Sequence, residues 1–253
     1  MDLFLKLVFL CPMLFIAGIV DGVSGGGGII ALPAYLMTGM PVTAAYGCNK
    51  MQSCIGTGAS LFRYAKSGYV DVRAALFSAV AAIVGSYVST QIMLSLSEST
   101  VKLIIAAAMC FIITLTLIIN KVASGENTRI HMTVKTVLQC FGIGLILGLY
   151  DGFFGPGGGT IALMLFSMIF KYNVCTASGN GKLIIVVSNF SALVNYIING
   201  SVLYEYAIPA TIANILGSYI GASLAVKNGK KIVKKFMLAV VVMLVGQAVL
   251  KLL

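Results

Sequence analysis

The hydrophobic positions of the chain fall into ten runs, which short polar or glycine-rich stretches separate. A membrane-spanning helix needs about 20 apolar residues, and several of these runs approach or exceed that length. The second run of each half has only about 13 residues, which fits a half-helix or re-entrant segment better than a full crossing. The pattern predicts helical segments near 3–21, 28–40, 46–65, 72–94, 99–120, 134–152, 158–170, 176–198, 204–226 and 233–252.

The two halves of the chain repeat one another. At an offset of 130 residues, Gly18, Asp21, Gly22, Gly25, Gly27 and Gly28 fall on Gly148, Asp151, Gly152, Gly155, Gly157 and Gly158. At an offset of 132, "GCNK" (47–50) falls on "GNGK" (179–182), and "GSY" (85–87) on "GSY" (217–219). We therefore divide the chain into an N-terminal transmembrane repeat (1–120), a cytoplasmic linker (121–133) and a C-terminal transmembrane repeat (134–253).

Five segments per half is an odd number, so the halves are expected to enter the membrane in opposite directions. Basic residues favour the cytoplasmic side, and placing the 63–73 connection inside leaves both termini outside. Inverted repeats are typical of secondary transporters with a site at the repeat interface, although some channels share them. Twelve of the 17 basic residues then lie inside, namely Arg63, Lys66, Arg73, Lys121, Arg129, Lys135, Lys171, Lys227, Lys230, Lys231, Lys234 and Lys235.

Composition supports the membrane assignment. Hydrophobic residues make up 59% of the chain and charged residues only 9%, against about 25% charged in a soluble domain. The fold class is therefore an all-α polytopic membrane protein. The net charge of +10 comes from short loops without a basic, aromatic-rich domain, so no nucleic acid is expected as a partner.

Several other features argue against enzymatic, metal-binding or secretory interpretations. The six cysteines lie in or beside apolar segments without CxxC or CxxH spacing, so neither a metal site nor a disulfide framework is expected. No HExxH motif occurs and the single histidine, His131, lies in the polar linker; no enzyme activity and no cofactor are predicted. The first apolar run matches a segment in mid-chain, so we expect it to be retained and not cleaved as a signal peptide.

Two lysines, Lys50 and Lys182, lie inside apolar segments at equivalent positions of the two halves. A charge within a membrane helix costs several kcal/mol on insertion scales, roughly 2.5–3.5, so such a residue faces a cavity or a partner. Lys50 and Thr57 are seven residues apart and share a helix face, as do Lys182 and Asn189. An anion-binding role is the first hypothesis; ion pairs with Asp21 and Asp151, or snorkelling to the interface, are the alternatives.

The stretches "DGVSGGGG" (21–28) and "DGFFGPGGG" (151–159) predict two broken helices. Glycine permits positive φ and close backbone approach, and the helix that resumes presents free N–H groups that bind anions. Tight packing of small residues is the alternative. The predicted anion site comprises Lys50, Lys182, Asn49, Thr57, Asn180, Asn189, Gly25, Gly26, Gly27, Gly28, Gly157, Gly158 and Gly159, with Asp21 and Asp151 for charge balance or proton coupling.

The motifs "DGVSGGGGIIALPAYL", "CNKMQ" and "YDGFFGPGGG" resemble those of the sulfite exporter TauE/SafE family, also described as four-toluene-sulfonate uptake permeases. The resemblance covers essentially the whole chain, and the third motif is similar to that of a branch named as probable membrane transporter proteins. It implies a multi-pass carrier of the cell membrane for sulfite, organosulfonates or related small anions, usually in the export direction. It also makes a homodimer plausible.

The combined expectation is a secondary transporter that moves a small sulfur oxyanion by alternating access, with membrane lipids around it. An anion channel and a carrier of a non-sulfur anion, such as a carboxylate, remain alternatives.

Overall fold

The computed structural model describes residues 3–97, 99–101, 130–229, 231–233 and 235–236. Helices make up most of these residues, and no strand occurs among them, so the prediction of an all-helical fold is confirmed. The segments expected near 99–120 and 233–252 lie for the most part outside the described residues. The helices are α1 (Leu3–Ser24), α2 (Gly28–Met37), α3 (Val42–Lys66), α4 (Val72–Ser95), α6 (Val134–Phe153), α7 (Gly158–Phe170), α8 (Val174–Ile198) and α9 (Tyr204–Asn228).

The helices begin and end within a few residues of the predicted bounds. Pro41 is the N-cap residue of α3, which begins four residues earlier than predicted. α2 ends at Met37, and Gly39 follows it with a φ of +82°. Both interior helices α2 and α7 are short, at 10 and 13 residues, as the pattern predicted.

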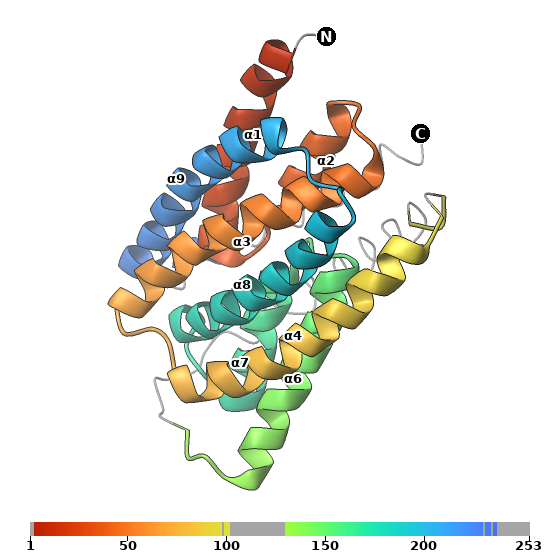
Figure 1. Cartoon of the computed structure of the whole chain (residues 1–253). Helices are drawn as coiled ribbons and strands as arrows, with labels where there is room; N and C mark the ends of the chain where they lie inside the picture. The colour runs from red at the N-terminus through yellow and green to blue at the C-terminus, as the bar shows by residue number, and fades with distance from the viewer. Residues whose placement is uncertain (1–2, 98, 102–129, 230, 234, 237–253) are drawn as a thin grey trace, which may run out of the picture.

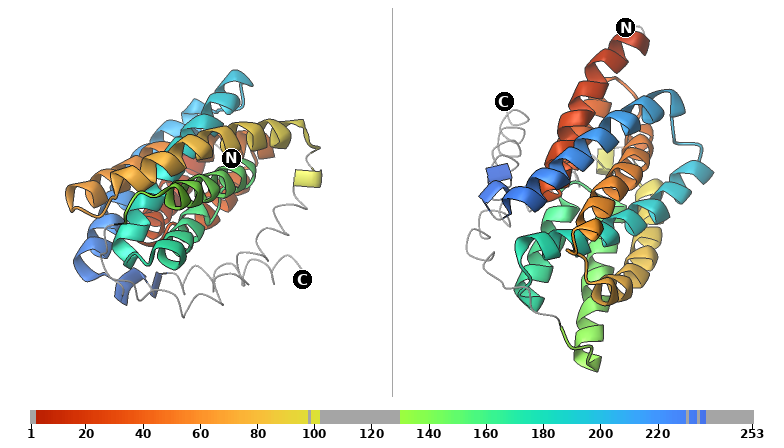
Figure 2. Two further views of the ribbon diagram at one scale, coloured as in Figure 1. Left: turned by 90° about the horizontal axis from the view of Figure 1, so that it is seen from below. Right: turned by 90° about the vertical axis from the view of Figure 1, so that its left-hand side faces the viewer.

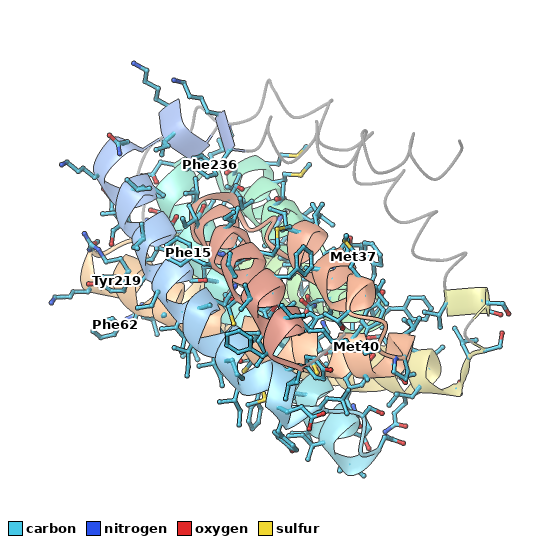
Figure 3. All side chains as sticks on the ribbon, turned by 90° about the horizontal axis from the view of Figure 1, so that it is seen from above. Phe15, Met37, Met40, Phe62, Tyr219 and Phe236 are labelled. Carbon is cyan, nitrogen blue, oxygen red and sulfur yellow. The ribbon has the colours of Figure 1, made fainter. Side chains whose placement is uncertain are left out.

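Within the part of the chain that the structure describes, five helices are long and apolar enough to cross a membrane: α1, α4, α6, α8 and α9. The 25-residue α3 has the length to cross but a much more polar sequence, because it carries Lys50 and its polar neighbours. Large apolar side chains project outward from these helices, including Phe62 and Tyr219 (Figure 3), and Phe62 is 61% exposed. A surface of this kind suits contact with lipid, whereas water-soluble proteins rarely expose so much apolar area.

The helices pack in an arrangement that crosses the two halves of the sequence. α1 lies against α9, and α4 lies against α6 (Figures 1 and 2). α3 packs on α9 and α8 packs on α4, while α3 and α8 contact one another at the centre. In Figure 1, α1 runs downward from the N-terminus and its counterpart α6 runs upward.

Small residues bring the paired helices into backbone contact. A Cβ atom added at Gly18 of α1 would lie 2.5 Å from the carbonyl oxygen of Asn214 in α9. A Cβ atom added at Gly148 of α6, the equivalent position, would lie 2.7 Å from Cα of Ala82 in α4. Close approach through small residues is how membrane helices gain packing energy. At Gly18 and Gly148, therefore, glycine serves the tight packing of helices.

Candidate functional site

Two breaks in the helical backbone form the middle of the molecule. The first separates α1 from α2 and the second separates α6 from α7, and each contains a glycine of positive φ, Gly25 at +79° and Gly155 at +88°. The breaks touch: a Cβ atom on Gly159 would lie 2.6 Å from Cα of Gly25. The hydroxyl of Thr160 also donates to the carbonyl oxygen of Ser24 at 2.9 Å. The glycines therefore allow the two interrupted segments of backbone to cross in contact with one another.

Lys50 of α3 is fully buried beside the second break. Its ammonium lies 3.2 Å from Oδ2 of Asp151 and donates to Oδ1 of Asn189 at 2.9 Å and to the carbonyl oxygen of Asp151. Ser188 donates to the same Asp151 Oδ2 at 2.8 Å. A lysine ammonium has three N–H groups, and all three of those on Lys50 have protein acceptors.

Lys182 of α8 makes the corresponding contacts at the first break. Its ammonium lies 2.8 Å from Oδ2 of Asp21 and also donates to the carbonyl oxygen of Asp21. Thr57 donates to the same carboxylate oxygen at 3.0 Å. The Asp21 side chain is 17% exposed, whereas that of Asp151 is 3% exposed, so the two ion pairs differ in their access to solvent.

Each ion pair joins the two halves of the chain. Lys50 comes from the first half and Asp151 from the second, while Lys182 and Asp21 reverse this relation. Buried charges of this kind need a partner and further hydrogen bonds, since the cost of desolvation otherwise exceeds the Coulomb attraction. The site is therefore electrically balanced and hydrogen-bonded without any ligand.

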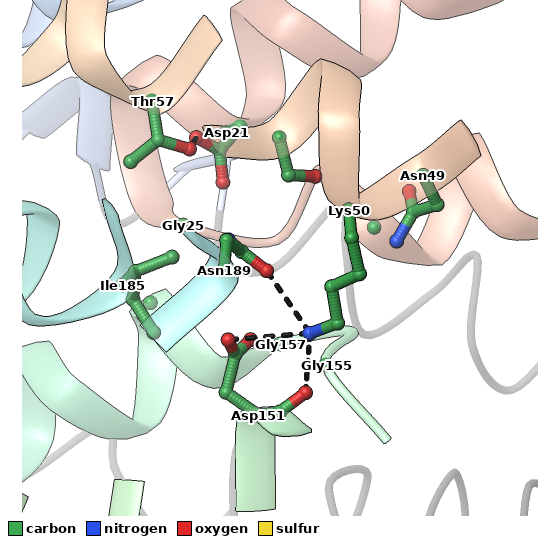
Figure 4. Close-up of a pocket in the computed structure, with 13 residues that line it drawn as sticks. Asp21, Gly25, Asn49, Lys50, Thr57, Asp151, Gly155, Gly157, Ile185 and Asn189 are labelled. Carbon is green, nitrogen blue, oxygen red and sulfur yellow. Dashed lines mark hydrogen bonds and ion pairs between the residues drawn. The ribbon is translucent and has the colours of Figure 1, made fainter. Parts of the chain in front are cut away.

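A small cavity lies between the two breaks and the middle of α3 (Figure 4). The volume of this cavity is about 20 Å³, close to the minimum of roughly 10–15 Å³ that one water molecule requires. An anion of several atoms would therefore have to displace side chains or helices. The lining residues are Asp21, Gly25, Gly28, Asn49, Lys50, Ser53, Thr57, Asp151, Gly155, Gly157, Gly159, Ile185 and Asn189.

Most of the residues predicted from the sequence meet around this cavity, including one lysine, both aspartates and four of the glycines. Lys182 lies behind the carboxylate of Asp21 and is absent from the lining, as are Gly26, Gly27 and Gly158. Asn180 lies elsewhere: its Oδ1 accepts a hydrogen bond of 2.8 Å from the backbone N–H of Asp71, at the start of α4. Asn180 therefore anchors the α3–α4 connection in this structure.

The sequence reasoning left some contributors to the site out of the predicted set. Ile185 lines the cavity and is three residues after Lys182, so the helical period places it on the same face. An apolar residue in an apolar helix gives no sequence signal for a binding site. Ser53 lines the cavity and Ser188 donates to the carboxylate of Asp151, and neither belongs to the predicted set. Ser188 could have been found, because it precedes Asn189 in a helix that already carried the predicted lysine.

The fold and the site together define the class of protein: a polytopic helical membrane protein with a charge-balanced site between broken helices. Residues 10–248 match the model of the family described as "Sulfite exporter TauE/SafE". The chain belongs to this family, which makes it a membrane transporter.

Related proteins agree with this assignment. A "Probable membrane transporter protein" of Sinorhizobium is 30% identical over 92% of this chain and 88% of its own length. One of Haemophilus influenzae is 29% identical, covering 93% and 91%. The "Probable membrane transporter protein YfcA" of Escherichia coli is 25% identical, covering 94% and 87%. No solved structure matches the chain.

Proposed function

We propose that this transporter is a secondary carrier that exports a small anion, of which sulfite, an organosulfonate or a related sulfur oxyanion is the best candidate. The description of the matching family as a sulfite exporter supports both the substrate class and the direction. Lysine ammonium groups and glycine N–H groups are the donors that such an oxyanion requires.

The observation that carries the proposal is the reciprocal pairing of Lys50 with Asp151 and of Lys182 with Asp21. The three acceptors around the Lys50 ammonium leave no N–H for a further ligand. The anion therefore takes the place of a carboxylate, so that it competes with an aspartate for the lysine ammonium. Thr57, Asn189 and Asn49 complete the polar wall that selects among oxyanions.

The two aspartates also determine the net charge of the site when an anion is bound. Two lysines and two aspartates give a neutral site, so a bound anion leaves an uncompensated negative charge in a buried cavity, which is costly. Uptake of a proton by a displaced carboxylate removes that charge. Asp21 is the better candidate for this proton, because it lines the cavity and is the more exposed of the two side chains.

We propose further that the two halves are inverted repeats in the cell membrane, with both termini outside. The opposite courses of α1 and α6 support the inversion (Figure 1). The basic residues of the α3–α4 connection and of the start of α6 lie toward the same lower end in that view, and the positive-inside bias favours that end as cytoplasmic.

Transport in proteoliposomes tests this function. Vesicles loaded with unlabelled sulfite should take up labelled sulfite by saturable counterflow, and a double variant, Lys50→Met with Lys182→Met, should not. Counterflow with a carboxylate and none with sulfite or methanesulfonate would identify a non-sulfur carrier. Unitary currents without saturable counterflow would identify an anion channel and overturn the carrier proposal.

A further inference from the structure

The helices of the described chain form two packed groups that do not coincide with the two halves of the sequence. α1, α2, α3 and α9 contact one another, and so do α4, α6, α7 and α8. We name these the first body (3–66 and 204–228) and the second body (72–95 and 134–198). Each body has three helices from one half and its fourth, α9 or α4, from the other half.

Side-chain hydrogen bonds reinforce the first body across the sequence halves. Ser60 of α3 donates to the carbonyl oxygen of Ser218 in α9 at 3.0 Å. The Nε of Arg63 donates to the hydroxyl of Ser223 at 3.0 Å, again from α3 to α9. Asn214 of α9 donates to a carbonyl oxygen of α1 at 3.0 Å. The borrowed α9 is therefore bound to both α1 and α3.

The second body is reinforced in the same way. Ser86 of α4 donates to the carbonyl oxygen of Ser188 in α8 at 2.7 Å, and Gln91 donates to Asn195 Oδ1 at 2.8 Å. Thr90 of α4 donates to a carbonyl oxygen of α6 at 3.1 Å. With the glycine-mediated backbone contact between α4 and α6, these bonds make α4 part of the second body.

The interface between the bodies is centred on the contact of α3 with α8, and both ion pairs cross it. Lys50 of the first body holds Asp151 of the second, and Lys182 of the second holds Asp21 of the first. Apolar clusters lie on either side of this charged layer. Tyr196 of α8 joins the cluster around α1 and α2, and Tyr64 of α3 joins the cluster around α6 and α7.

Two of the described connections lead from one body to the other. The α3–α4 connection contains Gly68 and the α8–α9 connection contains Gly200, at equivalent positions. Their φ values are +76° and +64°, and a Cβ atom at either would meet nothing within 4 Å. Open space therefore surrounds these two glycines, and hinges at the ends of elements absorb large changes of φ and ψ in moving proteins.

We infer that the moving units of this protein are the two bodies that exchange their fourth helices, and that the two ion pairs hold them together at the α3–α8 contact. Breaking the ion pairs lets the bodies rock about this contact, with Gly68 and Gly200 as hinges. One apolar cluster opens at one end while the other closes at the opposite end. The sequence halves themselves do not move as units, because α4 and α9 are bound into the other half.

Distance measurements between spin labels test this inference without any ligand. Labels at Phe62, Val80, Phe190 and Ile212 lie on the exposed faces of α3, α4, α8 and α9, in a background with the six native cysteines replaced. The pairs 62–212 and 80–190 lie within a body but in different halves. The pairs 62–80 and 190–212 lie within a half but in different bodies.

The perturbation removes both members of each ion pair, Lys50→Met with Asp151→Asn and Lys182→Met with Asp21→Asn, so that no buried charge is left unpaired. Ser53→Ala, which changes the cavity lining and no ion pair, is the matched control. We expect the two between-body distance distributions to shift or broaden, while the two within-body distributions keep the parental mean and width. Ser53→Ala should leave all four unchanged.

The opposite result, with constant distances inside each half and changed distances inside each body, would show that the sequence halves move. Four unchanged distributions would show that the ion pairs do not hold the bodies, and broadening of all four would show that no rigid bodies exist. Each of these outcomes overturns the inference. A failure of the sulfite counterflow described above would overturn the transport proposal alone, because the label experiment uses no anion.

Discussion

The two ion pairs occupy equivalent places in the repeated sequence and differ in their surroundings. Lys50 and Asp151 are almost completely enclosed, with Asn189 and Ser188 as further partners. Lys182 and Asp21 have Thr57, and the Asp21 side chain reaches both the cavity and solvent. The two pairs thus differ in role: the first is an enclosed anchor and the second is the more accessible pair.

The largest expected effect is the loss of stability when Lys50 is replaced. Lys50→Ala leaves Asp151 as an unpaired carboxylate in a buried site, and breaking a buried ion pair costs about 3–5 kcal/mol. We expect a large loss of thermal stability in detergent, partly restored by adding Asp151→Asn. A thermal midpoint equal to that of the parent would contradict the enclosed-anchor role.

A smaller effect tests the crossing of the two helix breaks. A Cβ atom on Gly25 would lie 2.8 Å from the backbone nitrogen of Thr160 and closer still to Gly159, whereas one on Gly39 would meet nothing within 4 Å. Both glycines have a φ near +80°, so both alanine variants carry similar strain. Gly25→Ala should cost about 1–3 kcal/mol more than Gly39→Ala, measured by thermal unfolding; equal losses would mean that the crossing tolerates an extra atom.

The second lysine should be less critical for stability. Lys182→Ala leaves Asp21, but the partial exposure of this carboxylate lets water replace part of the lost contact. We expect a loss of about 1–3 kcal/mol, below that of Lys50→Ala in the same thermal assay. The reverse order would show that Lys182 and Asp21 form the structural anchor.

The smallest effect is the difference between the two hydroxyl donors. Thr57→Val and Ser188→Ala each remove one hydrogen bond to a carboxylate, worth about 1.5–3 kcal/mol for a charged acceptor and less where water can enter. Ser188→Ala should destabilise more, because Asp151 is the more enclosed acceptor. Unfolding midpoints of the two variants check this order, and a larger loss for Thr57→Val would oppose it.

Much of this architecture could be predicted from hydrophobic periodicity and internal repetition. The lengths of the apolar runs gave the helices to within a few residues, and buried charges within apolar helices pointed to Lys50 and Lys182. Which aspartate pairs with which lysine could not be assigned, because a single sequence does not reveal that α4 and α9 pack with the opposite half. For the same reason the sequence predicts Asn180 in the site, whereas in the structure its amide oxygen accepts a hydrogen bond from the N–H of Asp71. Gly155 was visible as part of the second break, but only the structure brings it beside Lys50.

The central claim is that a small anion replaces the aspartates at the two lysines. Its most direct test is the sulfite affinity of purified protein, followed through the rise in thermal stability that a ligand of the folded state produces. The account predicts saturable stabilisation of the parent and at least a tenfold weaker affinity, about 1.4 kcal/mol, in the double variants Lys50→Met with Asp151→Asn and Lys182→Met with Asp21→Asn. Undiminished affinity in both double variants would contradict it.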